Sequence, residues 1–484
     1  MFEEHPTIRT TRQVSRLTIQ RVRDPVHNLI EFDTQVELER VVWQLLQSRP
    51  FQRLRRIKQL GFSELVYPGA THTRLAHSIG VFHTARQLMT TVRKKSTENN
   101  ETREKIALSA AMVHDVGHGP FSHAFETVGK RLGLKLADHE VMSDELIRNG
   151  EIAEILNNGF MAGFAANVAN MIKKEGKITL HNSVVSSQFD ADRLDYMQRD
   201  RLMTGSKHSA IALVWLLANL DIGNVTTGID DTEVGTFPTF VIGPKAIQAA
   251  EAYVMGLFQL YPTIYFHKTT RGAELLFTEI LVRLVRLVQD GAVERTGLPA
   301  NHPIVRFARE PEAVESVLAL DDTVVWGALH LVRLSEDKLL ASFADRLLNR
   351  KLFKCYDIRS EIAHRVDPHN LSESQDLARI EKCCASIAQK LQQLESEEEG
   401  AVPRVFVDAT ERKPYKAGGS SHGHNEQIYV RTDGGMLIDI RQRSEVVRAL
   451  SVYKLTRAYY DPDDGDARKI ITDIIEGEIT NVRH

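Results

Sequence analysis

The sequence predicts a mainly α-helical core followed by a smaller α+β region. Apolar residues return every three or four positions, the period of an amphipathic helix, in Val81–Val92, Ile106–Val113, Ile211–Leu220 and Leu275–Val288. Strand and hairpin patterns, in contrast, collect toward the C-terminal end. We therefore divide the chain into a helical core over 1–334, which includes a basic N-terminal segment, and an α+β region over 335–484 with a regulatory or oligomerisation role.

In the first region, one short strand is expected to interrupt the helices. Phe240–Ile242 follows an acidic, glycine-containing turn and precedes Gly243-Pro244, which predicts a β element there. In the second region, helical segments continue through Leu347 and over Ile380–Leu394. They end in the acidic run Glu395–Glu399, which has the composition of a solvated linker.

The rest of the second region has β patterns. Val405–Val407 is strand-like, and Asp433-Gly434-Gly435 marks a hairpin turn within Ile428–Ile440. Between them, the Lys416–Asn425 loop contains His422 and His424. Its Gly and Ser content favours a flexible linker over a metal site.

Bulk properties restrict the compartment and the partners. The formal net charge is −3, so a nucleic-acid surface would have to be local. The three cysteines lack CxxC spacing, which suits a reducing compartment, and no apolar run reaches the length of a membrane span. The N-terminus has charges where a signal peptide needs an apolar core. We expect a cytoplasmic protein without membrane association.

Basic residues cluster near the N-terminus. A solvated basic face or intersubunit salt bridges explain this cluster better than nucleic-acid binding does. Its members are Arg9, Arg12, Arg16, Arg21, Arg23, Arg53, Arg55, Arg56 and Lys58.

The residues that point to chemistry begin with His114 and Asp115. An apolar helix through Ile106–Val113 runs directly into this pair, and the Gly117–Pro120 stretch prevents its simple continuation. A neutral imidazole beside a carboxylate suits a hydrolytic divalent metal ion, which keeps room for water and phosphate oxygens.

Three other segments have polar side chains where a core helix would be apolar. Arg74 and His77 are three positions apart and so share a helical face, which pairs a ligand with a phosphate-binding guanidinium. Asp138-His139-Glu140 is either a helix N-terminus or part of a site. The third segment is a polar stripe at helical spacing, and a solvated, salt-bridged face is an equally good explanation for it. This stripe consists of Asp192, Asp195, Tyr196, Arg199 and Asp200.

These residues resemble a known signature. The order His77, His114-Asp115, Asp192 is similar to the H…HD…D pattern of the HD-domain phosphohydrolases, and more narrowly the sequence resembles their deoxynucleoside triphosphate triphosphohydrolases. The resemblance implies an HD-domain helical core. Matching phrases run in one order at Asp24–His27, Phe51–Leu54, Lys58–Gly61, Tyr67–Ala70, His77–Gly80, His114–His123 and Asp192–Asp200.

The resemblance also implies a role for each residue of a site. The metal ion, one of Mn, Mg, Fe or Zn, would have as ligands His77, His114, Asp115 and Asp192. The catalytic group would be His118, which contacts phosphate, with His123, Glu126 and His139, which handle protons near the α-phosphorus. Substrate contacts would come from Gln59, Leu60, Arg74, Arg193, Tyr196, Tyr265 and Lys268. The family's arginine for the outer phosphates has no counterpart near Leu257, so triphosphate binding requires Lys268 or Arg271 to take over.

The function expected from this resemblance is metal-dependent hydrolysis of a dNTP to a deoxynucleoside and triphosphate. One alternative is a nuclease or phosphodiesterase acting on single-stranded nucleic acid, which the N-terminal arginines and the missing outer-phosphate arginine favour. Another alternative is a nucleotide-sensing assembly protein with a degenerate site. The partners implied are a nucleotide substrate, an activating nucleotide and further copies of the chain, with a tetramer favoured.

Overall fold

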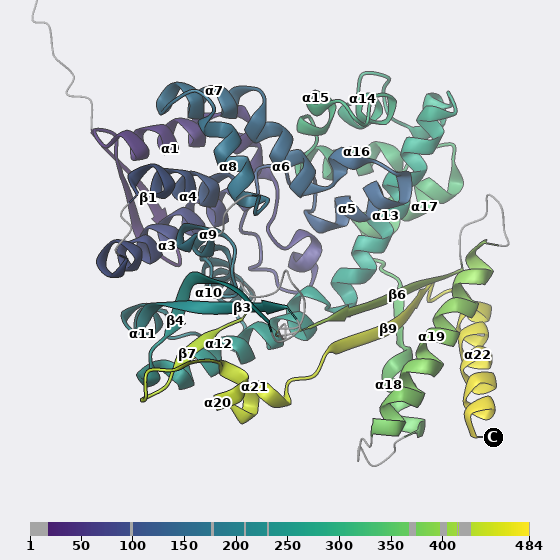
Figure 1. Cartoon of the computed structure of the whole chain (residues 1–484). Coiled ribbons are helices and arrows are strands. Elements are labelled where there is room, and N and C mark those ends of the chain that lie inside the picture. Colours follow the sequence, from purple (N-terminus) through teal and green to yellow (C-terminus); the bar gives the residue numbers. More distant parts are fainter. Residues whose placement is uncertain are drawn as a thin grey trace, which may run out of the picture.

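The computed structural model describes residues 18–483, apart from 97–99, 176–178, 208–209, 230–231, 367–373, 397–403, 414 and 416–426. It is mainly α-helical with small sheets (Figure 1), which confirms the predicted fold class. The predicted Lys416–Asn425 loop and most of the Glu395–Glu399 run lie outside the described residues, as do Arg9, Arg12 and Arg16.

Helix α3 (Arg74–Lys95) lies at the centre of the larger core, packed against α4 (Glu101–Val113) and α10 (Ala191–Thr204). The predicted helical segments Val81–Val92 and Ile106–Val113 fall within α3 and α4. Nearby lie α1 (Glu37–Gln47), α2 (Arg49–Arg53), α5 (His123–Leu132), α6 (His139–Arg148), α7 (Glu151–Gly159), α8 (Phe164–Ile172) and α9 (Leu180–Val185).

The long helix α13 (Lys268–Gln289) includes the predicted segment Leu275–Val288 and packs against α5. It follows α12 (Ile247–Leu260) after a π-helical turn at Tyr261–Tyr265. The helices that come next are α14 (Pro303–Arg309), α15 (Val314–Leu318), α16 (Asp322–Val332) and α17 (Lys338–Leu348). Leu340 and Leu347 of α17 belong to the larger core. Core packing therefore continues past position 334, and the division at that position stays a prediction.

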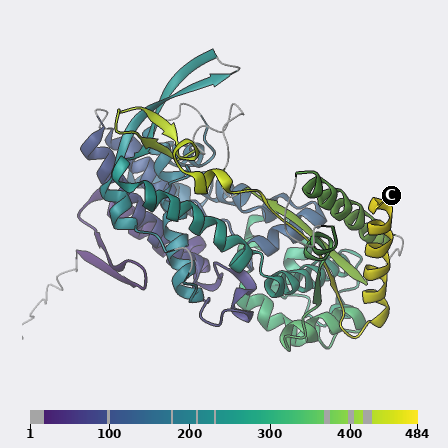
Figure 2. The same ribbon diagram turned by 90° about the horizontal axis from the view of Figure 1, so that it is seen from below.

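A four-stranded sheet has the order β3-β4-β7-β8. β3 (Leu220–Ile229) and β4 (Thr232–Ile242) form a hairpin that projects from the helical body in Figure 2. The predicted strand at Phe240–Ile242 is the end of β4. β7 (Tyr429–Arg431) and β8 (Leu437–Asp439) are the predicted hairpin, and β7 pairs in parallel with β4.

The prediction of a helix over the whole of Ile211–Leu220 is wrong. The helix there, α11, is limited to Leu213–Ala218, and Leu220 begins β3 opposite Ile242. A short apolar run suits a helix and a buried strand equally well, so the pairing with a distant strand decides.

A three-stranded antiparallel sheet with three helices forms the C-terminal region, which confirms its predicted α+β character. The strand order is β5 (Lys354–Asp357), β9 (Tyr453–Tyr460) and β6 (Val405–Arg412). The helices are α18 (Ile358–Val366), α19 (Ser374–Ser396) and α22 (Gly465–Arg483), and they enclose a second apolar core. Two short helices, α20 (Ile440–Arg443) and α21 (Glu445–Ala449), lie between β8 and β9.

The N-terminal hairpin of β1 (Ile19–Asp24) and β2 (Asn28–Asp33) has no counterpart in the sequence prediction. Its turn is held by Asp24, whose Oδ1 accepts hydrogen bonds of 2.9 Å from the N–H groups of Val26 and His27.

The expected solvated basic face is wrong for Arg53. This side chain is only 2% exposed, and its Nε donates a hydrogen bond of 2.8 Å to the Leu320 carbonyl. Burial lowers the pKa of Arg53 to about 10, against the opposing effect of Asp321 and Asp322. Arg56 donates to Asp321 as well, at 2.5 Å. These cations therefore connect α2 to the start of α16.

Across the described helices, none combines the length and the apolar character needed to cross a membrane.

Candidate active site

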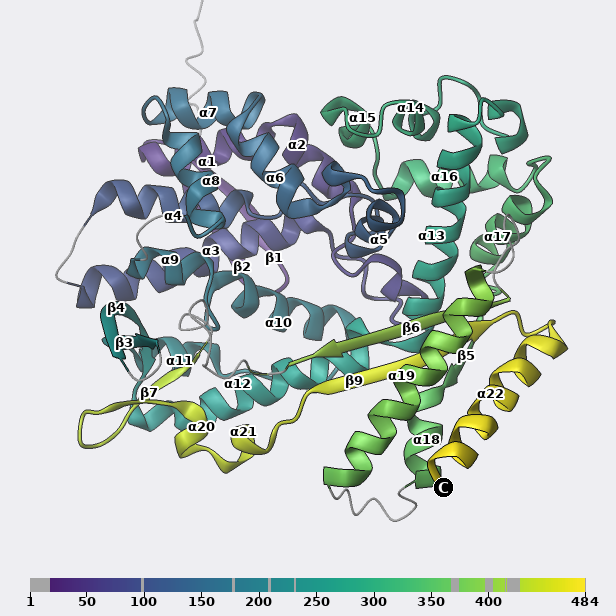
Figure 3. The same ribbon diagram turned by 45° about the vertical axis from the view of Figure 1, so that its right-hand side comes forward.

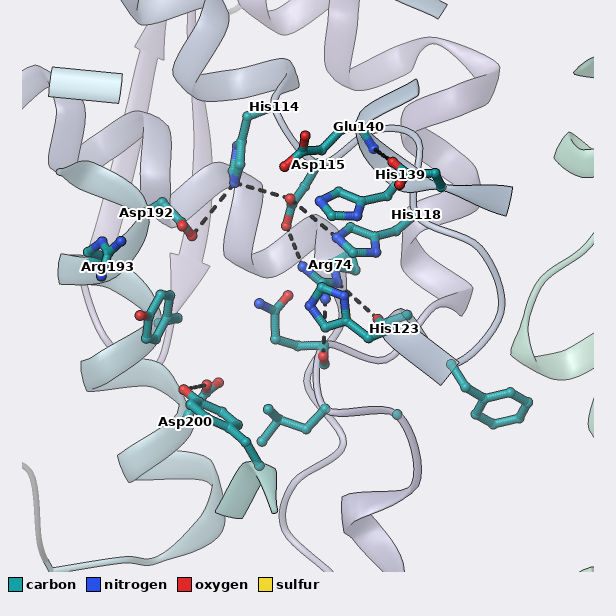
Figure 4. Close-up of a pocket in the computed structure, with 18 of the residues that line it drawn as sticks. Arg74, His114, Asp115, His118, His123, His139, Glu140, Asp192, Arg193 and Asp200 are labelled. Carbon is teal, nitrogen blue, oxygen red and sulfur yellow. Dashed lines mark hydrogen bonds and ion pairs between the residues drawn. The ribbon is translucent and has the colours of Figure 1, made fainter. Parts of the chain in front are cut away.

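The four predicted metal ligands approach one another at the ends of helices, and Figure 4 shows three of them, His114, Asp115 and Asp192. His77 Nε2 lies 3.0 Å from Asp192 Oδ1 and 3.7 Å from Asp115 Oδ2. His114 Nε2 lies 3.4 Å from Asp115 Oδ1 and 3.7 Å from Asp192 Oδ1. The structure thus brings together residues that are more than a hundred positions apart in the sequence.

Local sequence explains where these helices begin and end. Asp190 caps α10, since its carboxylate accepts hydrogen bonds from the N–H groups of Arg193 (2.8 Å) and Ser187 (2.9 Å). This cap places Asp192 in the first turn. α4 ends at Val113, which leaves His114 at its C-cap and Asp115 just beyond.

The two imidazoles are oriented as metal ligands require. His77 Nδ1 bonds to Asp195 Oδ2 at 2.8 Å, and His114 Nδ1 bonds to the Ala111 carbonyl at 3.0 Å. When Nδ1 donates to such acceptors, the lone pair of Nε2 is left for a metal ion. Within the part of the chain described, His114 Nε2 is buried without a hydrogen-bond partner. The donor set therefore fits a divalent cation.

The electrostatics of the cluster also favour positive charge. Burial opposes the imidazolium form of His77, but hydrogen bonds to Asp192 and Asp195 raise its pKa to about 10. Burial likewise opposes ionisation of Asp115, yet His114 and Arg74 hold the pKa of this carboxyl well below its usual range. A cation bound here would take over the stabilising role of these protons.

A second group of titratable side chains lies beside the first. Glu126 is its centre, because its Oε1 is 2.9 Å from His123 Nδ1 and 2.6 Å from His139 Nδ1. The ring of His139 stacks on that of His118, with centroids 4.0 Å apart. Burial opposes the shift, but the two histidines lower the pKa of Glu126, so this carboxylate stays ionised. The group thus places three ionisable side chains around one carboxylate, next to the candidate metal ligands.

The interpretation of Asp138-His139-Glu140 as a helix N-terminus is confirmed, and its role in a site stays a prediction. Asp138 caps α6 through the N–H groups of Glu140 (2.9 Å) and Val141 (3.3 Å). The same cap directs His139, the first residue of α6, toward Glu126.

A strained turn lies on the next side of the cavity. Phe121 and Ser122 have φ values of 56° and 57°, which residues with side chains seldom adopt. The Phe121 N–H donates to Asp322 Oδ1 (2.7 Å), and the Ser122 hydroxyl donates to the Lys58 carbonyl (2.8 Å). Ser122 Oγ accepts from Arg74 Nε at 3.0 Å, while another Arg74 nitrogen forms an ion pair with Asp115. The turn therefore fixes Arg74 beside the metal ligands.

Asp322 also holds the segment around Lys58. Its Oδ2 accepts a hydrogen bond of 2.9 Å from the Lys58 N–H, next to Gln59 and Leu60. Burial raises the pKa of Asp322 to about 7, although these two backbone donors act against the shift.

An aromatic wall closes the other end. The Tyr196 and Tyr265 rings meet edge to face with centroids 6.3 Å apart, and Tyr265 Oη donates to Asp200 Oδ2 at 2.8 Å. The other oxygen of Asp200 lies 2.8 Å from His72 Nε2. Burial opposes the charge of Arg193, but Tyr196 and Asp190, followed by Tyr253 and Tyr261, raise its pKa.

One cavity of about 1070 Å³ joins these parts. The predicted site residues on its wall are Gln59, Leu60, Arg74, His114, Asp115, His118, His123, His139, Asp192, Arg193, Tyr196 and Tyr265. His77 lies behind this wall and is fully buried. Glu126 reaches the wall through its two histidines. Lys268 is exposed at the start of α13 and does not line the cavity.

The comparison with known proteins agrees with this geometry. A family model for the HD domain matches residues 74–199. The uncharacterised protein YwfO of Bacillus subtilis is 30% identical over 452 residues, which are 91% of this chain and 92% of YwfO. The chain belongs to the HD-domain phosphohydrolase family. A solved phosphohydrolase from Bacteroides thetaiotaomicron superposes on the chain with a TM-score of 0.67 at 26% identity. That match covers 91% of this chain and 99% of the other.

Another HD-domain relative is the deoxynucleoside triphosphate triphosphohydrolase SAMHD1 of Danio rerio. It is 36% identical over 156 residues, which are 30% of this chain and 24% of SAMHD1. HD domains bind divalent metals, and in this chain His77, His114 and Asp192 offer ligand atoms close enough to share one ion.

The sequence prediction missed the residues that support the HD ligands. Asp195 bonds to His77 Nδ1 through one oxygen and lies 2.6 Å from His27 Nε2 through the other. Arg199 bridges Asp195 (2.8 Å) and Asp24 (2.7 Å), and all of these groups are buried. Helical spacing placed Asp195 and Arg199 on one stripe, but their partners 118 and 175 positions away were not visible.

At position 80, only glycine leaves room for the side chains of Asp195 and Arg199. A Cβ added at Gly80 would lie 2.0 Å from Asp195 Oδ1 and 2.3 Å from Arg199 Nη2. We therefore expect Gly80→Ala to displace Asp195 from His77 and to weaken metal binding by about 10- to 100-fold, the usual effect of losing such a partner. Competition with a chelator measures this affinity.

The matched control is Gly327→Ala in α16, where an added Cβ meets nothing within 4 Å. Both changes put alanine into a helix, which by itself is favourable. Gly327→Ala should keep the wild-type metal affinity, and wild-type affinity in Gly80→Ala would contradict the supporting role of Asp195.

Proposed function

We propose that this HD-domain protein hydrolyses deoxynucleoside triphosphates to a deoxynucleoside and inorganic triphosphate. The observation that carries the proposal is a single cavity whose wall combines candidate metal ligands, the two arginines Arg74 and Arg193 beside them, and a tyrosine wall. Its volume suits a ligand of the size of a nucleotide. SAMHD1 of Danio rerio, which matches 30% of this chain, is a deoxynucleoside triphosphate triphosphohydrolase, and this relative supports the same substrate class.

The proposed reaction adds water across one bond of the nucleotide. The water oxygen bonds to the α-phosphorus, the bond from phosphorus to O5′ breaks, and O5′ takes up a proton. A divalent ion on His77, His114, Asp115 and Asp192 would supply Lewis-acid stabilisation of the phosphate oxygens.

The chain's own residues would supply binding and proton transfer. Arg74 and Arg193 carry guanidinium groups, which bind phosphate oxygens in a bidentate manner. The His123 side chain is 68% exposed, and Glu126 holds its Nδ1, so Nε2 is free to donate a proton to O5′. His139 and Glu126 would return that proton between turnovers.

The tyrosine wall, formed by Tyr196 and Tyr265, would contact the deoxyribose of the substrate. Tyr196 packs against Tyr265, and both oxygens of Asp200 already contact Tyr265 and His72. A 2′-hydroxyl placed against the tyrosine rings, away from these polar groups, would lose its hydrogen bonds to water and stay unpaired. Such a loss costs about 1–3 kcal/mol.

Product analysis tests the proposal. Four dNTPs, the four NTPs and a labelled single-stranded oligonucleotide are incubated with Mg²⁺ or Mn²⁺, with and without GTP or a second dNTP as activator. At least one dNTP should yield triphosphate and deoxynucleoside, and the matching NTP should react about tenfold more slowly or worse. Intact dNTPs with a degraded oligonucleotide in the same buffers would replace the proposal by the nuclease alternative.

A further inference from the structure

The cavity wall carries more cations than the metal ligands and α-phosphate require. Most of them already have a partner. Arg74 pairs with Asp115, Lys173 lies 2.8 Å from Asp144, and Arg193 lies 3.6 Å from Asp190. The remaining cations on the wall are Lys174, Arg271 and Arg412.

Arg271 is not free to bind a phosphate. Its Nε and Nη2 donate to the two oxygens of Asp408 at 2.9 and 2.8 Å, and its Nη1 donates to Glu274 at 2.8 Å. All three nitrogens of this guanidinium donate to carboxylates, so the geometry gives no support to the sequence-based expectation that Arg271 replaces the missing arginine.

Lys174 likewise makes no ion pair with a described residue, but it is exposed and no described contact fixes its side chain. Arg412 differs from Lys174 and from Arg271, because it is unpaired and yet held in place. Its guanidinium carbon lies 4.8 Å from the centroid of the Tyr261 ring. Among the residues that the structure describes, it makes no ion pair and its side chain makes no hydrogen bond. Stacking on a ring leaves the N–H edge of a guanidinium open, and that edge matches the oxygens of a phosphate.

The strand that carries Arg412 is firmly held. Arg412 is the last residue of β6 and pairs with Tyr453 of β9. Four positions earlier, Asp408 points from the same face of the strand and is fixed by Arg271 of α13. Figure 3 shows that β6 runs from the C-terminal region toward α10 and α12. The C-terminal region thus places one side chain in the cavity of the HD core.

Arg412 shares the cavity wall with residues beside the candidate metal ligands. Asp192 is a candidate metal ligand, Arg193 follows it in α10, and Tyr261 is an electrostatic neighbour of Arg193. Arg412 lies over the ring of that same tyrosine. Arg193, Tyr261 and Arg412 line the same cavity as Asp192, which makes Arg412 a further cationic group for an anion bound there.

We infer that Arg412 binds a phosphate of the substrate beyond the α-phosphate. The inference rests on the proposed function and specifies its ligand as a polyphosphate rather than a monophosphate. A neutral base would gain little from an unpaired guanidinium, whereas a charge-assisted contact with the outer phosphates is strong.

Calorimetric titration with inorganic triphosphate, and separately with a deoxynucleoside monophosphate, tests Arg412→Gln. We expect the affinity for triphosphate to fall by about 10- to 100-fold and the affinity for the monophosphate to change by less than about twofold. In turnover assays the same variant should raise KM for dNTPs and leave kcat nearly unchanged. Arg412→Lys should restore little, because an ammonium lacks the bidentate edge.

Arg441→Gln is the matched control. Arg441 also lies over a tyrosine ring, at 5.7 Å from the Tyr415 centroid, but it does not line the cavity. It should bind triphosphate as the wild type does, and melting curves verify that both variants fold.

Two results would overturn the inference, and they differ in what else they affect. If the wild type hydrolyses dNTPs but Arg412→Gln keeps full triphosphate affinity, or loses triphosphate and monophosphate equally, the role of Arg412 is wrong and the proposed function stands. If the wild type binds neither triphosphate nor any dNTP, the proposed function fails together with the inference.

Discussion

Asp115→Ala should leave the folded protein with little bound metal and without measurable hydrolysis. This carboxylate lies near His77, His114 and Arg74 at once, and its loss removes the anionic charge on one side of the site. We expect metal affinity to fall by at least about 100-fold, since loss of a mere supporting partner already costs about 10- to 100-fold. Metal analysis of the purified variant and a turnover assay measure both effects.

The change also leaves the buried Arg74 without its ion pair, so stability has to be separated from metal loss. Asp337→Ala serves as the control, because Asp337 is equally buried and accepts two hydrogen bonds of 2.7 Å from Arg283 outside the cavity. It should lower the melting temperature and keep full metal content per folded molecule. A folded Asp115→Ala protein with normal metal and activity would refute the ligand assignment.

His123→Ala should reduce turnover by about two to four orders of magnitude while the metal content stays normal. His123 contacts Glu126 but none of the four candidate ligands, so its removal takes away a proton donor and leaves the metal site intact. Single-turnover hydrolysis together with metal analysis distinguishes these effects.

His302→Ala is a suitable control, since His302 likewise stands at a helix start and accepts a backbone hydrogen bond, in α14 away from the cavity. It should retain turnover. The four residues His118, His123, Glu126 and His139 also have the geometry to hold an ion. A lower metal stoichiometry in His123→Ala would therefore make this group a second metal site and contradict the proton-transfer role.

Local sequence patterns were sufficient for several helices and for singling out His114 and Asp115, whereas the full set of site residues came from the family resemblance. His114 and Asp115 stood out because an apolar helix ended at them, before glycines and a proline that no helix continues through. The β7–β8 hairpin was visible because Asp433-Gly434-Gly435 separates two apolar stretches. In each case the information lies within a few neighbouring residues.

The remaining features depend on contacts that no local pattern contains. Arg53 has the sequence context of a surface arginine and is buried because Leu320 and Asp321 lie over it. The sequence made Arg271 a candidate for phosphate binding. In the structure, its guanidinium is paired with Asp408, which lies on a strand far along the chain. The sequence could not place Arg412 at the cavity either, because only the pairing of β6 with β9 brings it there.

The turn at Phe121 and Ser122 bears on how this chain can be recombined with its relatives. Its strained backbone is held by Asp322 from α16, which also fixes the Lys58 N–H beside Gln59. The segment matched by the HD family model ends at residue 199, well before that carboxylate. A chimaera that exchanges only residues 74–199 would therefore combine one parent's turn with the other parent's clamp. Crossover points that keep 58–60, 121–122 and 322 from a single parent would preserve the shape of the phosphate side of the cavity.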